Sequence, residues 1–254
     1  MKNGYWVIRT YESGAVGEKI KYFIPGERPS RSRRKINSEI NRQEKNETQV
    51  IRSLARLLNA NFKKGDILLT LDYSDEGLDV ILDKALESKN IDIDEAIYKA
   101  AEHEMKLCLR RVKRECDMLG IELKYAATTS DMDGETNENV RVHHHLVINR
   151  EALSVFKEKW TLGEAHHEPL SGQKDYTAIA EYFIKQVRKI KDAKKYVSSR
   201  NLLRPQPKDR VAMNNSELRT PAKAVLLHRS EYRPDRPQYI RYLKCKEEGE
   251  EQIE

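Results

Sequence analysis

The chain of 254 residues has 38% hydrophobic residues, 35% charged residues and a formal net charge of +6. This length suits one large domain or one domain with extensions, and the basic balance is modest evidence for an anionic partner. Three cysteines without a Cys-x-x-Cys spacing argue against a disulfide scaffold or a zinc ribbon, and they favour a cytoplasmic protein with reduced thiols. The sequence predicts no membrane span and no signal peptide, and the absence of a P-loop motif excludes a P-loop motor.

The N-terminal part is expected to contain two short strands and a basic arm. Residues 5–11 and 20–24 are rich in aromatic and β-branched side chains, as strands are. The stretch at 26–35 begins with Gly and Pro, which break regular structure, and then becomes basic through Arg31, Arg33, Arg34 and Lys35. This arm is equally compatible with a solvated loop and with a segment that contacts phosphates.

The middle of the chain is predicted to contain a helix at 46–62, a strand at 66–73, a long helix at 93–119, and strands at 121–129 and 140–148. Cys108 and Cys116 lie on the apolar stripe of the long helix, so we expect buried thiols rather than a redox pair. A turn-rich acidic loop separates the last two strands, which predicts that they are antiparallel neighbours.

The C-terminal half is predicted to contain a helix at 150–160, a loop at 161–174, a helix at 175–191, a basic proline-containing segment at 198–210, and strands at 222–232 and 238–245. Asp175 is the expected N-cap of the second helix. These elements predict an α+β fold with a central antiparallel sheet of about five strands and flanking helices. We divide the chain into N-terminal strands and basic arm (1–45), a core (46–200), and a basic segment with C-terminal strands that complete the sheet, followed by an acidic tail (201–254).

Three consecutive histidines lie inside the strand at 140–148. Because side chains alternate across a strand, His143 and His145 share one face, while His144 falls among the apolar positions and is best interpreted as a packing residue. Two imidazoles at this spacing can ligate one divalent cation. An ordinary polar surface is the alternative, because a lone His-x-His is a weak signal.

The helix at 175–191 offers a tyrosine away from its apolar stripe. At about 100° per residue, Tyr176 falls on the stripe if the helix has already begun at that residue, whereas Tyr182 lies roughly 110° from the centre of the stripe. Lys185 is on the same side as Tyr182. Tyr182 is compatible with a boundary tyrosine whose hydroxyl is solvated, and also with a nucleophile. A free phenol ionises near pH 10, so a nucleophile needs help from a nearby cation.

The order apolar strand, long helix, strand, His-x-His strand and Tyr-x-x-Lys helix resembles the HUH endonucleases, and specifically the rolling-circle replication initiators of plasmids and phages. "DILLTLDY", "VHHHLVIN" and "AEYFIK" are similar to the three motifs of that family, and the resemblance spans roughly residues 45 to 245. It implies an HUH/RRM-like sheet.

The resemblance also implies roles for individual residues. His143 and His145 would hold Mn²⁺ or Mg²⁺, and Tyr182 would attack the scissile phosphate with Lys185 as its partner. The family often has an acidic or amide third ligand, for which Asp131 and Asp72 are the candidates here. Phosphate contacts are expected from basic residues, namely Arg31, Arg33, Arg34, Lys35, Lys189, Arg200 and Arg204.

The implied activity is the nicking and joining of single-stranded DNA at a replication origin, by a single-tyrosine enzyme that relies on a host helicase and polymerase. Three alternatives remain at this point. A plasmid relaxase or single-tyrosine transposase would use the same chemistry. A non-catalytic nucleic-acid-binding module would use aromatic stacking on the sheet. A zinc hydrolase would need an acid poised as base, and no HExxH-like spacing is present.

Overall fold

The computed structural model describes residues 4–26, 40–87, 92–136, 138–190 and 194–245. The predicted arm residues Arg31, Arg33, Arg34 and Lys35 therefore lie outside the described residues. Within those ranges, no helix combines the length and the hydropathy that a membrane crossing requires.

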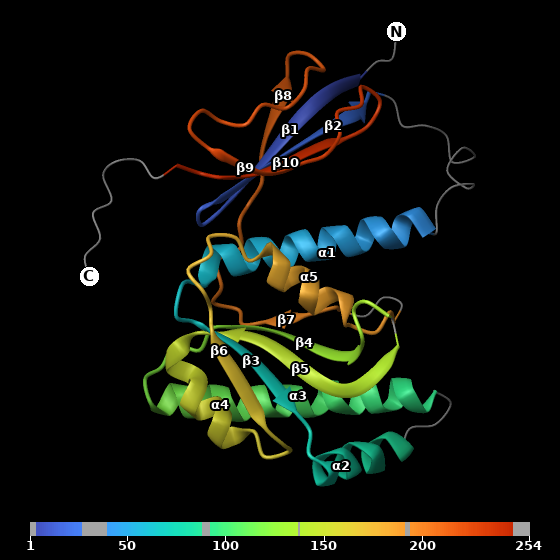
Figure 1. The fold of residues 1–254 in the computed structure, drawn as a ribbon, viewed down its shortest axis with the longest axis vertical. Helices are drawn as coiled ribbons and strands as arrows, with labels where there is room; N and C mark the ends of the chain where they lie inside the picture. Colours follow the sequence, from blue (N-terminus) through green and yellow to red (C-terminus); the bar gives the residue numbers. More distant parts are fainter. Residues whose placement is uncertain (1–3, 27–39, 88–91, 137, 191–193, 246–254) are drawn as a thin grey trace.

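The protein has an α+β fold with two antiparallel five-stranded sheets, which confirms the predicted class (Figure 1). We call the sheet that carries the three histidines the histidine sheet. Its strands, in spatial order, are β6 (Ala165–Pro169), β3 (Ile67–Asp72), β5 (Asn139–Ile148), β4 (Tyr125–Met132) and β7 (Val197–Ser198). The histidine strand β5 is thus central, and it pairs antiparallel with β3 and β4.

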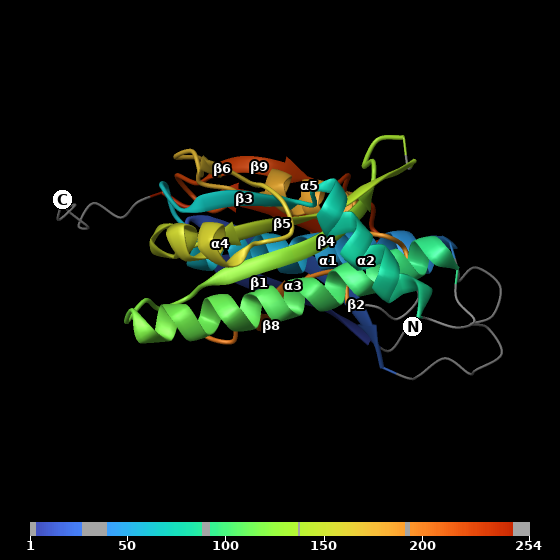
Figure 2. The ribbon, with the colours of Figure 1, turned by 90° about the horizontal axis from the view of Figure 1, so that it is seen from below.

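Helices cover both faces of the histidine sheet (Figures 1 and 2). One face packs against α2 (Asp75–Leu86), α3 (Ile93–Met118) and α4 (Leu153–Lys159), the last preceded by a 3-10 turn at Arg150–Ala152. Cys108 and Cys116 of α3 are fully buried there, as predicted. The other face packs against α1 (Ile40–Asn61) and α5 (Thr177–Lys185).

The second sheet combines the two ends of the chain. Its strands, in spatial order, are β8 (Lys208–Ala212), β1 (Gly4–Ser13), β2 (Val16–Pro25), β10 (Gln238–Leu243) and β9 (Val225–Arg229). The C-terminal strands therefore do not complete the histidine sheet, contrary to our expectation. The β1–β2 hairpin offers two open edges, which β8 and β10 occupy, whereas β6 and β7 already flank the histidine sheet. Helix α1 lies between the two sheets (Figure 1).

Three local features differ from the sequence prediction, and two of them have a physical explanation. The expected loop at 161–174 contains β6, whose mostly exposed side chains give no hydrophobic alternation. Helix α2 was not predicted. Helix α5 is shorter than the expected 175–191, because the carbonyl of Gln186 accepts hydrogen bonds from the backbone N–H groups of Asp131 and Met132 instead of continuing the helix.

Candidate metal and nucleophile site

The side chains of His143 and His145 converge on the α5 side of the histidine sheet. Their Nε2 atoms are 2.9 Å apart and their ring centroids are 4.6 Å apart. The neighbouring strand β3 places Asp72 opposite His143 and Thr70 opposite His145. The predicted alternation of side chains along this strand is confirmed, because Val142, Leu146 and Ile148 pack into the core on the other face.

Hydrogen bonds determine which nitrogen of His143 is available to a ligand. Nδ1–H of His143 donates to the carbonyl oxygen of Arg141 at 2.8 Å, so Nε2 of the neutral ring carries a lone pair. Nδ1 of His145 lies 3.1 Å from Oγ1 of Thr70, which can accept from it in the same way. This is the arrangement that orients imidazoles toward a metal, with one ring nitrogen held by the protein and the other free.

The site keeps His145 neutral. Burial, with a smaller effect from the neighbouring His143, lowers the pKa of His145 to about 4. An unprotonated imidazole is the form that binds metal ions. The Nε2 atom of His145 is therefore a competent ligand at neutral pH.

His144 points to the opposite face and is fully buried, as expected of a packing residue. Its Nε2 atom lies 2.8 Å from the hydroxyl of Tyr73, and its Nδ1 atom lies 3.1 Å from Oγ1 of Thr129. Burial lowers the pKa of His144 to about 3. Because both ring nitrogens have buried partners, His144 serves the core and does not reach the site on the α5 face.

Gln186 contributes a third polar atom that the sequence analysis missed. Its Oε1 atom lies 3.3 Å from Nε2 of His145, and the residue is only 8% exposed. The signal was available, because Gln186 follows Tyr182 by four residues and positions four apart share a helix face. An amide oxygen is a suitable ligand for hard and borderline divalent cations.

Each of the two carboxylates proposed as third ligands has one oxygen in contact with another side chain, whereas Oδ1 of Asp131 is buried without a hydrogen-bond partner in the described part of the chain. Oδ2 of Asp131 accepts a hydrogen bond from Nε of Arg188 at 2.6 Å, and burial raises the pKa of the Asp131 carboxyl. Asp72 is opposite His143, but its Oδ2 atom lies 3.5 Å from Nε2 of His166. Within the described ranges, no group of three His, Cys, Asp or Glu side chains is arranged to hold a metal ion. The donor set that the structure brings together is two imidazoles and one amide.

Tyr182 lies directly beside this donor set. Its ring centroid is 4.9 Å from that of His145, and the residue is 50% exposed. Tyr176 is 4% exposed and belongs to the apolar cluster between α1, α5 and the sheet. Both placements agree with the predicted helix faces. Phe183 stacks on the ring of His145 with centroids 5.5 Å apart. This stacking restrains the imidazole that Tyr182 contacts.

Within the described ranges, the remaining predicted site residues have no hydrogen bond or ion pair with this centre. Lys185 is exposed at the end of α5, and in the described part of the chain no hydrogen bond or ion pair joins it to Tyr182. Lys189, Arg200 and Arg204 are also exposed.

Comparisons of the chain with protein-family models, with curated proteins and with solved structures found no match. The function of the protein is therefore inferred from the geometry of the site. Two imidazoles and an amide oxygen suit Mn²⁺ at least as well as Mg²⁺, because imidazole is a softer ligand than Mg²⁺ prefers. The residues present thus fit a divalent cation beside an exposed phenol.

Proposed function

We propose that the protein is a single-tyrosine HUH-type endonuclease that nicks and rejoins single-stranded DNA, as rolling-circle replication initiators do. The observation that carries this proposal is the contact between Tyr182 and His145. A potential nucleophile on one element and a potential cation site on another meet on the same face of the same sheet. A purely structural tyrosine would not need to be half-exposed beside two imidazoles.

The chemistry follows from the groups in the site. The Oη atom of Tyr182 attacks phosphorus in line, the Oη–P bond forms, and the bond from phosphorus to the 3′ oxygen breaks. The phenolic proton leaves Tyr182, and the departing 3′ oxygen takes up a proton, which gives a 5′-phosphotyrosine and a free 3′-OH. A divalent cation on His143, His145 and Gln186 would supply positive charge to the phosphate oxygens.

A covalent tyrosine ester preserves the phosphodiester linkage for a second transfer. A later 3′-OH can attack the phosphotyrosine and regenerate both the DNA strand and the phenol, whereas attack by water would prevent rejoining. The free 3′-OH can serve as a primer for a polymerase. In this proposal a host helicase unwinds the duplex, because the sequence contains no P-loop motif.

The open side of the site suits an extended polyanion. Tyr182 and His143 are reachable from solvent, and the exposed cations Lys189, Arg200 and Arg204 can neutralise phosphates. Contacts of this kind release counterions, so DNA affinity should fall steeply as salt increases. The N-terminal basic arm is a further candidate for phosphate contacts.

A covalent adduct assay tests the proposal. The protein is incubated with end-labelled single-stranded oligonucleotides that tile the DNA flanking its own gene, in the presence of Mn²⁺, and is analysed on a denaturing gel. We expect a protein–DNA adduct that Tyr182→Phe abolishes and that the matched variant Tyr176→Phe retains.

Two further results complete this test. His143→Ala should remove the adduct while circular dichroism shows an intact fold. If only Tyr176→Phe lost the adduct, Tyr176 would be the nucleophile and the assignment to Tyr182 would be wrong. The absence of any adduct on every oligonucleotide, with DNA binding retained, would favour a binding module without catalysis.

A further inference from the structure

A cavity of about 230 Å³ lies away from the histidine pair, where α1, β1 and the connection between β7 and β8 meet. Tyr11 of β1, Arg56 of α1, Tyr196 immediately before β7, and Arg204 of the β7–β8 connection line it. The cavity is thus built from the second sheet, the helix α1 and the segments on either side of β7. Of its lining residues, only Arg204 has a role in the proposal above, as a phosphate contact.

The inner wall of the cavity is rigid and combines a cation with an aromatic ring. The guanidinium of Arg56 lies 3.6 Å from the ring centroid of Tyr11. Its Nε and Nη2 atoms donate to Oε2 of the buried Glu18 at 3.1 and 2.7 Å. In the described part of the chain, Nη1 of Arg56 has no hydrogen-bond partner, so one donor of a fixed guanidinium remains for a ligand.

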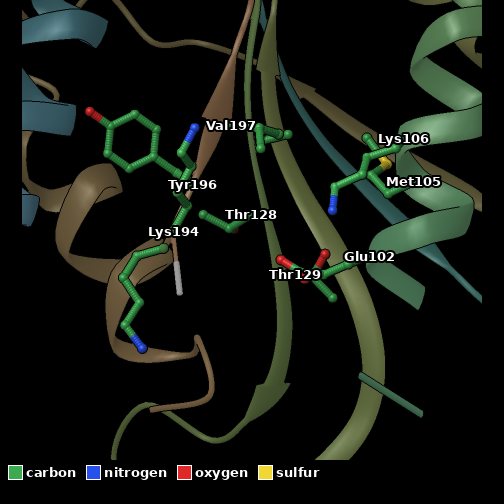
Figure 3. A pocket seen from close by; sticks show the side chains of 10 residues that line it. Glu102, Met105, Lys106, Thr128, Thr129, Lys194, Tyr196 and Val197 are labelled. Carbon is green, nitrogen blue, oxygen red and sulfur yellow. The ribbon is translucent and has the colours of Figure 1, made fainter. Parts of the chain in front are cut away.

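The outer wall carries a second aromatic ring, two hydroxyls and an exposed cation. The hydroxyls of Ser53 and Tyr196 are 3.2 Å apart, which holds the Tyr196 ring against α1. Figure 3 shows this ring on the side of its strand away from Lys106 and Glu102. Arg204 is exposed, and its Nη2 atom donates to Oγ of Ser198 at 3.2 Å.

The other side of the same segment is also basic. A smaller hollow, with space of about 20 Å³, is lined by Lys106, Lys194 and Lys195 together with Glu102 (Figure 3). Its size suits a water molecule rather than a base. The larger cavity is therefore the one that can admit a flat heterocyclic ring, and the cations around it would attract the phosphates attached to that ring.

We propose that the larger cavity binds one unstacked nucleotide of single-stranded DNA, with the base inside and the adjacent phosphate at Arg204. Aromatic rings and guanidinium groups are the surfaces on which bases of single strands stack, independently of sequence. The polar atoms of Ser53, Tyr196 and Arg56 supply hydrogen-bonding partners for the base edge. This inference rests on the proposed function in one respect only, namely that the partner is DNA.

Binding of a fluorescein-labelled oligothymidylate to the full-length protein, followed by anisotropy, tests this site. Ser53→Trp places a bulky side chain in the cavity, and Arg204→Ala removes the cation at its rim. We expect each variant to lose roughly tenfold in affinity, the loss that a single stacked base accounts for. The matched control Lys157→Ala removes an exposed charge on α4 and should stay within about twofold of wild type.

A photocrosslink keeps the inference falsifiable if Ser53→Trp does not fold. An oligonucleotide that contains bromodeoxyuridine should crosslink to Tyr196 on irradiation, and Arg204→Ala should reduce the yield. Wild-type affinity in a folded Ser53→Trp, or crosslinks that map only elsewhere, would overturn the site and leave the cavity as solvent-filled space between the sheets. Anisotropy and crosslinking measure binding alone, so wild-type protein that binds and crosslinks the oligonucleotide but forms no covalent adduct would overturn the nicking proposal and leave this site standing.

Discussion

The ring of Tyr182 lies 4.9 Å from the ring of His145, centroid to centroid, although the two residues belong to different secondary-structure elements. Three packed layers produce this contact. His145 belongs to the strand β5, and Tyr182 belongs to α5. Helix α1 packs against α5, and both helices contribute to one apolar cluster with the sheet. The relationship is therefore a property of the folded core, and substitutions that loosen α5 should affect the site.

Gln186 should contribute to cation affinity. Gln186→Ala removes the amide oxygen beside Nε2 of His145, so we expect Mn²⁺ to bind about tenfold more weakly or worse. Gln186→Glu should bind Mn²⁺ at least as tightly as wild type, because a carboxylate adds charge to the same position. Free Mn²⁺ measured by electron paramagnetic resonance during a titration checks both variants without any DNA. Equal affinity of wild type and Gln186→Ala would remove Gln186 from the ligand set.

Asp175 should stabilise the start of the nucleophile helix. Its Oδ1 atom accepts hydrogen bonds from the backbone N–H of Thr177 at 3.0 Å and from the hydroxyl of Thr177 at 2.6 Å. Its Oδ2 atom pairs with Nε of Arg241 at 3.1 Å, which ties α5 to the second sheet. The N-cap position itself is Tyr176, which makes no side-chain cap hydrogen bond, so Asp175 lies one residue before the position that the sequence predicted for it. We expect Asp175→Ala to lower the free energy of unfolding by about 1–2 kcal/mol, the usual effect of losing a part-buried hydrogen-bond acceptor.

Urea unfolding measures this effect, and Asp175→Asn serves as the control. Asparagine retains an oxygen that can accept from Thr177 but loses the charge that faces Arg241. It should therefore have an intermediate stability. If Asp175→Ala unfolds at the same urea concentration as wild type, the contacts at this helix end contribute nothing measurable.

His144 should make stability depend on pH. Its pKa is lowered from 6.5 to about 3 in the folded protein, so between these values the unfolded chain binds a proton that the folded chain does not. The free energy of unfolding should therefore fall as pH falls below about 6.5, by about 1.4 kcal/mol per pH unit for this group once its unfolded form is protonated. For this group, the free energy of unfolding is highest above pH 6.5 and decreases progressively toward pH 3.

Urea unfolding over this pH range, in chelator, tests the prediction against a His144→Asn variant. Other groups titrate in both proteins, so the informative quantity is the difference between their slopes. Wild type should show the steeper decline. Parallel slopes for the two proteins would show that His144 does not resist protonation in the folded state.

Gly77 should not tolerate a side chain. A Cβ atom at this position in α2 would lie 1.9 Å from the carbonyl oxygen of Leu162, which is backbone and cannot rotate away. We expect Gly77→Ala to cost about 1–3 kcal/mol, as other overpacked sites do. Gly172→Ala is the control, because its Cβ would meet the flexible Lys64 side chain at 3.5 Å. Thermal unfolding of the two variants compares them, and equal stabilities would contradict the close approach.

The sequence alone determined the features that depend on local periodicity. Alternation along a strand separated His143 and His145 from His144, and the helical period separated Tyr182 from Tyr176. The side-chain contacts agree with the first assignment, and the burial of the two tyrosines agrees with the second. The same periodicity identified the long helix α3 and its buried Cys108 and Cys116. Periodicity reports which side of an element is apolar, and the apolar side is the one that packs.

The tertiary structure decided what periodicity cannot express. Edge strand β6 has no apolar face, so its pairing with β3 is visible only once the sheet has formed. The partners of β9 and β10 depend on which sheet edge is open, and the open edge belonged to β2 at the far end of the chain. The position of Gln186 beside His145 likewise depends on how α5 docks on β5. Contacts between distant segments arise from packing, and packing is a property of the whole chain.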